Sequence, residues 1–107
     1  MKIEIKRKID ELGRIIIPIE LRRRYEMVNG DTLVFLSARE GIQVAKADDF
    51  ILNETPKNSV AVLDELGRII IPSALRKQFK LDTNDALRFV LNETCMLICK
   101  DKNQTLT

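Results

Sequence analysis

Histidine is absent from this chain of 107 residues, and cysteine occurs at only two positions. Zinc sites are built from His and Cys ligands, so the sequence lacks the ligands for one. Cys95 and Cys99 fall in an expected strand, where a spacing of four residues corresponds to about 13 Å. That distance is too long for a disulfide. We interpret both residues as small buried hydrophobic groups in a reducing compartment.

The sequence also lacks the patterns of common enzyme sites. It contains no glycine-rich phosphate loop, and no Ser or Cys has a plausible neighbouring base. The acidic residues Asp10, Glu11, Asp64 and Glu65 recur as turn residues and not as an evident acid and base pair. We therefore expect no enzymatic activity, no catalytic residues, no metal, no cofactor and no small-molecule substrate.

Long hydrophobic runs are missing as well. No apolar run approaches the roughly 18 residues of a membrane span, and residues 1–8 carry charges at alternate positions, which a secretory signal does not tolerate. A hydrophobic share of 45% with few Gly and Pro is typical of a folded chain of about one domain. These features predict a cytoplasmic protein without membrane association.

What the chain does contain is an internal repeat. The nonapeptide DELGRIIIP occupies residues 10–18 and recurs without a change at residues 64–72. The same offset of 54 residues continues without gaps from Ile9 and Leu63 to Lys46 and Lys100. Copies of about 45 residues are marginal for a core of their own, so we expect the two copies to share one. The expected organisation is a first repeat at 1–46, a linker at 47–57, a second repeat at 58–101 and a polar tail at 102–107.

Alternating and β-branched segments predict a mostly β fold with short helices, in which each copy has two strands, a helix and two more strands. Pro18 ends a strand and has a φ angle that suits a helix start. Gly30 becomes Asn84 in the second copy, and Asn tolerates left-handed geometry. Gly41, at a hairpin tip, becomes Cys95, which disfavours positive φ, so we expect a different loop there. The expected strands are 2–9, 14–17, 32–36, 42–46, 59–63, 68–71, 86–91 and 96–100, and the expected helices are 19–26 and 73–79.

Basic charge is concentrated in the first copy. Residues 1–46 carry ten Lys and Arg against seven Asp and Glu, a net charge of +3, whereas residues 47–107 carry eight against nine, a net charge of −1. Arg7 and Lys8 correspond to Ala61 and Val62, which are uncharged. We therefore expect an anionic partner to contact mainly the first copy.

The segment DELGRIIIP, followed by IELRRR and then NGDTLVF, resembles the AbrB family (AbrB/SpoVT/MazE-like) over nearly all of both repeats. The resemblance implies a swapped-hairpin β-barrel, a DNA-binding fold that two copies build together. Because both copies lie in one chain, the arrangement is either a pseudo-dimer within the chain or two chains that exchange copies. A short tether favours pairing within the chain.

The resemblance also implies that basic side chains of the barrel contact double-stranded DNA. Such side chains release condensed counterions from phosphates, and the planar fork of Arg can also bind base edges. For Arg14 and Arg68 an alternative is a structural ion pair with Asp10, Glu11, Asp64 or Glu65. The matching positions are Arg7, Lys8, Arg14, Arg22, Arg23 and Arg24 in the first copy and Arg68, Arg76 and Lys77 in the second.

These observations predict a bacterial or archaeal, nucleoid-associated transcription regulator. We expect it to bind double-stranded DNA by sequence or by A·T-rich shape, mainly through the first repeat and at an asymmetric target. No aromatic residue is placed among the basic ones for base stacking, so single strands and sequence-read RNA are poor candidates. Arg7→Ala or Arg22→Ala should cost more DNA affinity than Arg76→Ala.

The alternative function is protein binding, as an antitoxin-like or anti-repressor protein. About seven residues follow Lys100, too few to wrap a toxin, but a partner could dock on residues 50–52. The second copy, with fewer basic residues, could instead pair with another AbrB-like chain or with a second copy of this chain.

Overall fold

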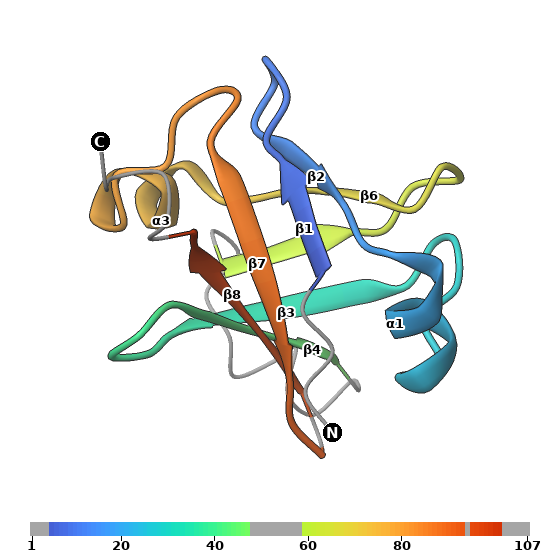
Figure 1. Cartoon of the computed structure of the whole chain (residues 1–107). Coiled ribbons are helices and arrows are strands. Elements are labelled where there is room, and N and C mark those ends of the chain that lie inside the picture. The colour runs from blue at the N-terminus through green and yellow to red at the C-terminus, as the bar shows by residue number, and fades with distance from the viewer. Residues whose placement is uncertain (1–4, 48–58, 94, 102–107) are drawn as a thin grey trace.

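The computed structural model describes residues 5–47, 59–93 and 95–101. Within these ranges the chain is mostly β with two short helices, as the sequence predicts (Figure 1). The expected linker and tail, and the proposed docking segment 50–52, lie almost entirely outside the described residues. The elements are β1 (Ile5–Lys8), β2 (Arg14–Ile16), α1 (Ile19–Arg24), β3 (Thr32–Ser37), β4 (Ile42–Lys46), β5 (Val60–Val62), β6 (Arg68–Ile70), α3 (Ser73–Gln78), β7 (Ala86–Leu91) and β8 (Met96–Lys100).

Both helices are slightly shorter than the sequence predicts. Each begins after a proline with an extended ψ, at Pro18 and at Pro72. Each is followed by a residue in the left-handed region, Glu26 with φ 54° and Lys80 with φ 55°. The carbonyl of Glu26 accepts a hydrogen bond from the Lys46 ammonium at 2.9 Å, and that of Lys80 accepts one from Lys100 at 3.0 Å. The left-handed residue ends each helix because it turns the chain out of the helical path.

The strands form two antiparallel sheets, a six-stranded sheet in the order β1-β7-β8-β4-β3-β5 and a two-stranded sheet of β2 and β6. Among the described strands, the pairs formed within one half of the chain are the hairpins β3–β4 and β7–β8. All other pairs join the N-terminal half to the C-terminal half: β1 with β7, β3 with β5, β4 with β8 and β2 with β6. The two halves therefore interleave.

The hydrophobic core draws on both halves. Phe35 and Phe89, at corresponding positions of β3 and β7, are 1% and 0% exposed. They belong to one buried cluster, against which Tyr25, Ala61, Leu75, Phe79 and Leu91 pack in part. The other buried members are Ile9, Ile15, Ile17, Leu21, Met27, Leu33, Ile42, Val44, Leu63, Ile69, Ile71, Leu81, Leu87, Met96 and Ile98.

Two expectations about small residues need correction. Cys99 is buried in β8, but Cys95 is half-buried and precedes that strand, so only Cys99 is a buried strand residue. Both are free thiols. Gly41 does not have a positive φ; a side chain there would collide with the carbonyl oxygen of Ile98. The substitution of Gly30 by Asn84 is accommodated as expected, with φ angles of 92° and 72°.

No helix in the described part of the chain is long and apolar enough to cross a membrane. In the same residues, no group of three or more His, Cys, Asp or Glu side chains is placed to hold a metal ion.

Candidate nucleic-acid interface

The two-stranded sheet of β2 and β6, here called the ribbon, has one buried and one exposed face. Ile15 and Ile69 lie opposite each other and are 1% exposed, so this face packs on the core. On the outer face Arg14 lies opposite Ile70, and Ile16 lies opposite Arg68. The run of Arg and three Ile in each half therefore gives a strand with alternate inward and outward residues.

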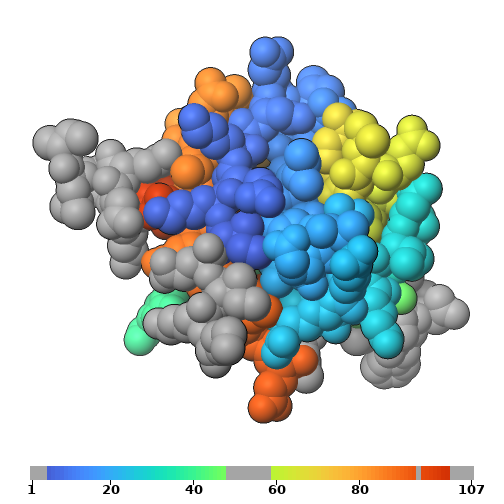
Figure 2. All heavy atoms as spheres, turned by 45° about the vertical axis from the view of Figure 1, so that its right-hand side comes forward, coloured from blue at the N-terminus to red at the C-terminus, as the bar shows by residue number. Residues whose placement is uncertain are grey.

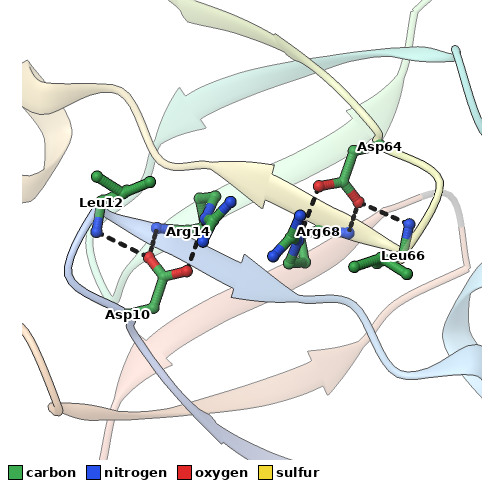
Figure 3. Close-up of polar contacts among 6 residues, drawn as sticks. All are labelled: Asp10, Leu12, Arg14, Asp64, Leu66 and Arg68. Carbon is green, nitrogen blue, oxygen red and sulfur yellow. Dashed lines mark hydrogen bonds and ion pairs between the residues drawn. The ribbon is translucent and has the colours of Figure 1, made fainter.

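Each arginine of the ribbon is held by an aspartate of its own turn (Figure 3). The Arg14 Nε donates to Asp10 Oδ2 at 2.6 Å, and the Arg68 Nε donates to Asp64 Oδ2 at 2.8 Å. The other carboxylate oxygen of each aspartate accepts backbone N–H groups two and four residues ahead. The expected structural pairing is thus present with Asp10 and Asp64. The arginine side chains remain 27% exposed.

The same hydrogen bonds lower the pKa of both aspartates. Burial raises the pKa of Asp10, but the N–H groups of Arg14 and Leu12 and the guanidinium of Arg14 outweigh that effect. For Asp64 the backbone N–H of Arg68 is the largest influence, and the pKa is again lowered although burial opposes it. Both carboxylates are therefore ionised at neutral pH and fix the orientation of their arginines.

Two further arginines reach the ribbon from the helices. Arg22 of α1 donates from Nε to the carbonyl of Ile17, and its guanidinium lies so close to Gly67 that an added Cβ would be 2.6 Å from Cζ. Arg76 of α3 has the matching bond, to Ile71, and the matching position against Gly13. Each helix of one half thus places an arginine on the turn that begins the ribbon strand of the other half.

The ribbon therefore carries four arginines along its length, two from its strands and two from the flanking helices. Gly67 directly precedes Arg68, and Gly13 directly precedes Arg14, so each helical arginine lies against the residue that comes before an arginine of the ribbon. Figure 3 shows Arg14 and Arg68 next to each other over the middle of the ribbon. We call Arg14, Arg22, Arg68 and Arg76 the arginine row.

Exposed cations flank the row on the side of the N-terminal half. Arg7 and Lys8 lie on β1, which contacts β2, and Arg23 and Arg24 lie on the exposed side of α1. Figure 2 shows this strand and helix on the same face of the molecule. The corresponding residues of the C-terminal half are Ala61, Val62, Lys77 and Gln78, of which only Lys77 is basic. The cationic surface is thus asymmetric, although the row itself is not.

The nine residues expected to contact DNA consequently fall into two groups. The arginine row is half-buried and bonded within the protein. The remaining five, Arg7, Lys8, Arg23, Arg24 and Lys77, are exposed. Sequence reasoning did not identify Ile16 and Ile70, which are 45% and 52% exposed on the ribbon. The period of two in each run of isoleucines was the signal that could have revealed them.

Sequence comparison gives a local match. No established family model matches this chain. Over 33 residues, 31% of the chain, it is 52% identical to Abh, a proposed transition state regulator from Bacillus subtilis (strain 168). The similarity supports AbrB-family membership. The matched segment spans only 36% of the length of that relative.

Structure comparison covers most of the chain. The solution structure of PHS018 from Pyrococcus horikoshii matches with a TM-score of 0.51 over 94% of this chain and 95% of that one. The two sequences are 21% identical, so the likeness concerns the fold alone.

Proposed function

We propose that the chain is a DNA-binding transcription regulator whose two AbrB-like repeats form one swapped-hairpin barrel, a pseudo-dimer within a single chain. The pairing of β1 with β7 and of β5 with β3 supports this arrangement, because each half gives its first strand to the other half. The similarity to Abh supports regulation of transcription. The target is double-stranded DNA.

The arginine row is the observation that carries the proposal. Each Nε is occupied by an internal acceptor, which fixes the guanidinium plane, while the two terminal nitrogens carry four more N–H donors. A side chain held in advance loses less conformational entropy on binding. The row is thus suited to bidentate contacts with base edges or phosphates.

The flanking cations have a different role. Arg14 and Arg68 are paired with aspartates, so these pairs add little net charge to the surface. The four cations that flank the row in the N-terminal half are exposed: Arg7, Lys8, Arg23 and Arg24. Within the described residues, none of them forms an ion pair. We assign phosphate contacts and salt dependence to these four residues and geometric readout to the ribbon.

The test is fluorescence anisotropy of a labelled A·T-rich duplex, titrated with the protein over a series of salt concentrations. Arg23→Ala should weaken binding at low salt and reduce the slope of log affinity against log salt by about 1. Arg39→Ala is the matched control, because Arg39 is also exposed but lies at the β3–β4 turn, outside the ribbon and its flanking helices. No binding at low salt by the folded protein would refute the proposal.

The asymmetry of the target can be tested with the pair Arg22→Ala and Arg76→Ala. The two arginines make the same contacts, each with a 2.9 Å bond to a carbonyl and a glycine beneath the guanidinium, so both changes should cost the same stability. We expect the larger loss of DNA affinity for Arg22→Ala, because two further exposed arginines, Arg23 and Arg24, follow it on α1, whereas Arg76 is followed by Lys77 and the uncharged Gln78. Equal losses would contradict an asymmetric target.

Protein binding remains a second candidate, and a hollow in the C-terminal half favours it. The hollow, of about 490 Å³, is lined mainly by apolar residues of β5, β6 and the start of α3. It occupies the place that corresponds to the basic flank of the N-terminal half. Another AbrB-like chain, or a second copy of this one, could pair there. Light scattering of the protein, alone and after mixing with another AbrB-like chain, tests this candidate. A protein that stays monomeric in both cases would exclude it for the chain tested.

A further inference from the structure

Two isoleucines on the outer face of the ribbon have no role in the core. Ile16 and Ile70 are 45% and 52% exposed, although residues 15, 17, 69 and 71 on either side are almost completely buried. Single exposed apolar side chains are common on proteins. These two, however, alternate with the arginines of the row, since Ile16 lies opposite Arg68 and Ile70 opposite Arg14. The face is a checkerboard of two apolar and two cationic side chains.

The chemistry of this checkerboard matches the major groove of DNA. A two-stranded ribbon fits the groove, which is about 12 Å wide, and the groove presents guanine acceptors and the thymine C5-methyl group. The methyl group is the main apolar feature that a DNA duplex offers there. Diagonal neighbours in an antiparallel pair are about 7–8 Å apart, close to two base-pair steps of about 3.4 Å each. Ile16 and Ile70 are such diagonal neighbours.

The charge around the two isoleucines indicates which kind of molecule contacts the outer face of the ribbon. An apolar protein segment would bring backbone carbonyls but no negative charge for the four arginines that line the ribbon. A DNA duplex brings phosphate and base acceptors together with methyl groups. We infer that Ile16 and Ile70 read thymine methyl groups in the major groove, an assignment that rests on the DNA-binding function proposed above. They are specificity-determining residues, and the arginines beside them supply the polar contacts.

Deoxyuridine tests the inference, because it pairs like thymine but lacks the C5-methyl group. Two A·T-rich duplexes of one sequence, one with thymine and one with deoxyuridine, are titrated with the full chain in the anisotropy assay. Each lost contact should cost about fourfold in affinity, the factor expected when one methylene-sized group is no longer buried. Wild-type protein should therefore prefer the thymine duplex about tenfold or more.

The assignment to particular residues is tested with the double variant Ile16→Ser, Ile70→Ser. It should bind both duplexes with equal affinity. Leu36→Ser is the matched control, because Leu36 is 56% exposed on β3, outside the ribbon, and that variant should retain the thymine preference. Circular dichroism checks that the variants fold, and the comparison of duplexes with wild-type protein needs no variant.

The possible outcomes distinguish a failure of the methyl readout from a failure of the proposed DNA binding. Equal binding of the two duplexes by wild-type protein would overturn the methyl readout and leave DNA binding standing. A thymine preference that survives in the folded double variant would overturn the assignment to Ile16 and Ile70. Absence of binding to either duplex at low salt would remove the proposed function as well.

Discussion

Gly41 lies where the two halves of the chain pair, because the next residue, Ile42, is opposite Ile98 of β8. The φ angle of Gly41 is one that any residue can adopt, but there is no room for a side chain at this position. An added Cβ would collide with the carbonyl oxygen of Ile98 and lie 3.1 Å from the Cys99 sulfur. Because the blocking atom belongs to the backbone, Gly41→Ala can be accommodated only if β4 moves away from β8.

The cost of Gly41→Ala follows from two opposing effects. Overpacking in a well-packed region costs about 1–3 kcal/mol. The alanine also restricts the unfolded chain, which offsets about 0.4–1 kcal/mol of that loss. We therefore expect the free energy of unfolding to fall by about 1–2 kcal/mol, and Tm to fall by roughly 5–15 °C for a chain of this size.

Urea unfolding followed by circular dichroism measures this change. The midpoint should fall while the dependence of the free energy on urea stays constant, since the surface exposed on unfolding is the same. Cys95→Ala is the matched control: Cys95 holds the corresponding position and already carries a Cβ, so it should change stability by less than about 1 kcal/mol. An unchanged midpoint for Gly41→Ala, or an equal loss in the control, would refute the steric argument.

Two other predictions concern polar contacts. Tyr25→Phe should lower the free energy of unfolding by about 1 kcal/mol, because the single hydroxyl proton is shared between the carbonyls of Asn92 at 2.6 Å and Cys95 at 2.8 Å. Thermal melting that matches wild type would show that this hydrogen bonding contributes nothing. The lowered pKa of Asp10 and of Asp64 means that their stabilisation is complete above the ordinary value of 3.8 and is lost as pH falls through the lower pKa of the folded state. Unfolding measured from pH 6 to about pH 2 should therefore show a shallower acid loss for Asp10→Asn, Asp64→Asn than for wild type, and parallel profiles would count against the ion pairs.

Most of the individual strands could be predicted from local patterns. The repeat placed 86–91 and 96–100 where β7 and β8 lie, because the alternating strands expected at 32–36 and 42–46 recur 54 residues later. The ends of the helices could not be placed as well. They depend on left-handed residues at Glu26 and Lys80, neither of which is a glycine.

The candidate site was predictable in its residues but not in its geometry. The basic positions were evident from the sequence, and so was the possible pairing of Arg14 with Asp10. The position of Arg22 against Gly67 was not, because 45 positions separate the two residues in the chain and only the pairing of β2 with β6 brings them together. For the same reason Gly41 was misinterpreted. Local reasoning attributes a glycine to φ, whereas here a distant strand excludes the side chain.

The pattern of identity between the halves follows from these contacts. The guanidinium of Arg76 lies against Gly13, and that of Arg22 lies against Gly67, so each copy of DELGRIIIP is packed against the other half. A change at one glycine would displace an arginine of the opposite helix, which restricts both copies in the same way.

The first strands are under no such restriction on their outer face. Arg7 and Lys8 of β1 are exposed, and Val62 of β5 is 59% exposed. These positions could diverge into a basic and an apolar set without disturbing the shared ribbon. The ribbon is thus the same in both halves and can present one geometry to the bases. The residues beside it differ between the halves, so phosphates are attracted mainly to one side. The asymmetry of the predicted DNA target therefore arises from β1 and α1, and not from the repeated nonapeptide.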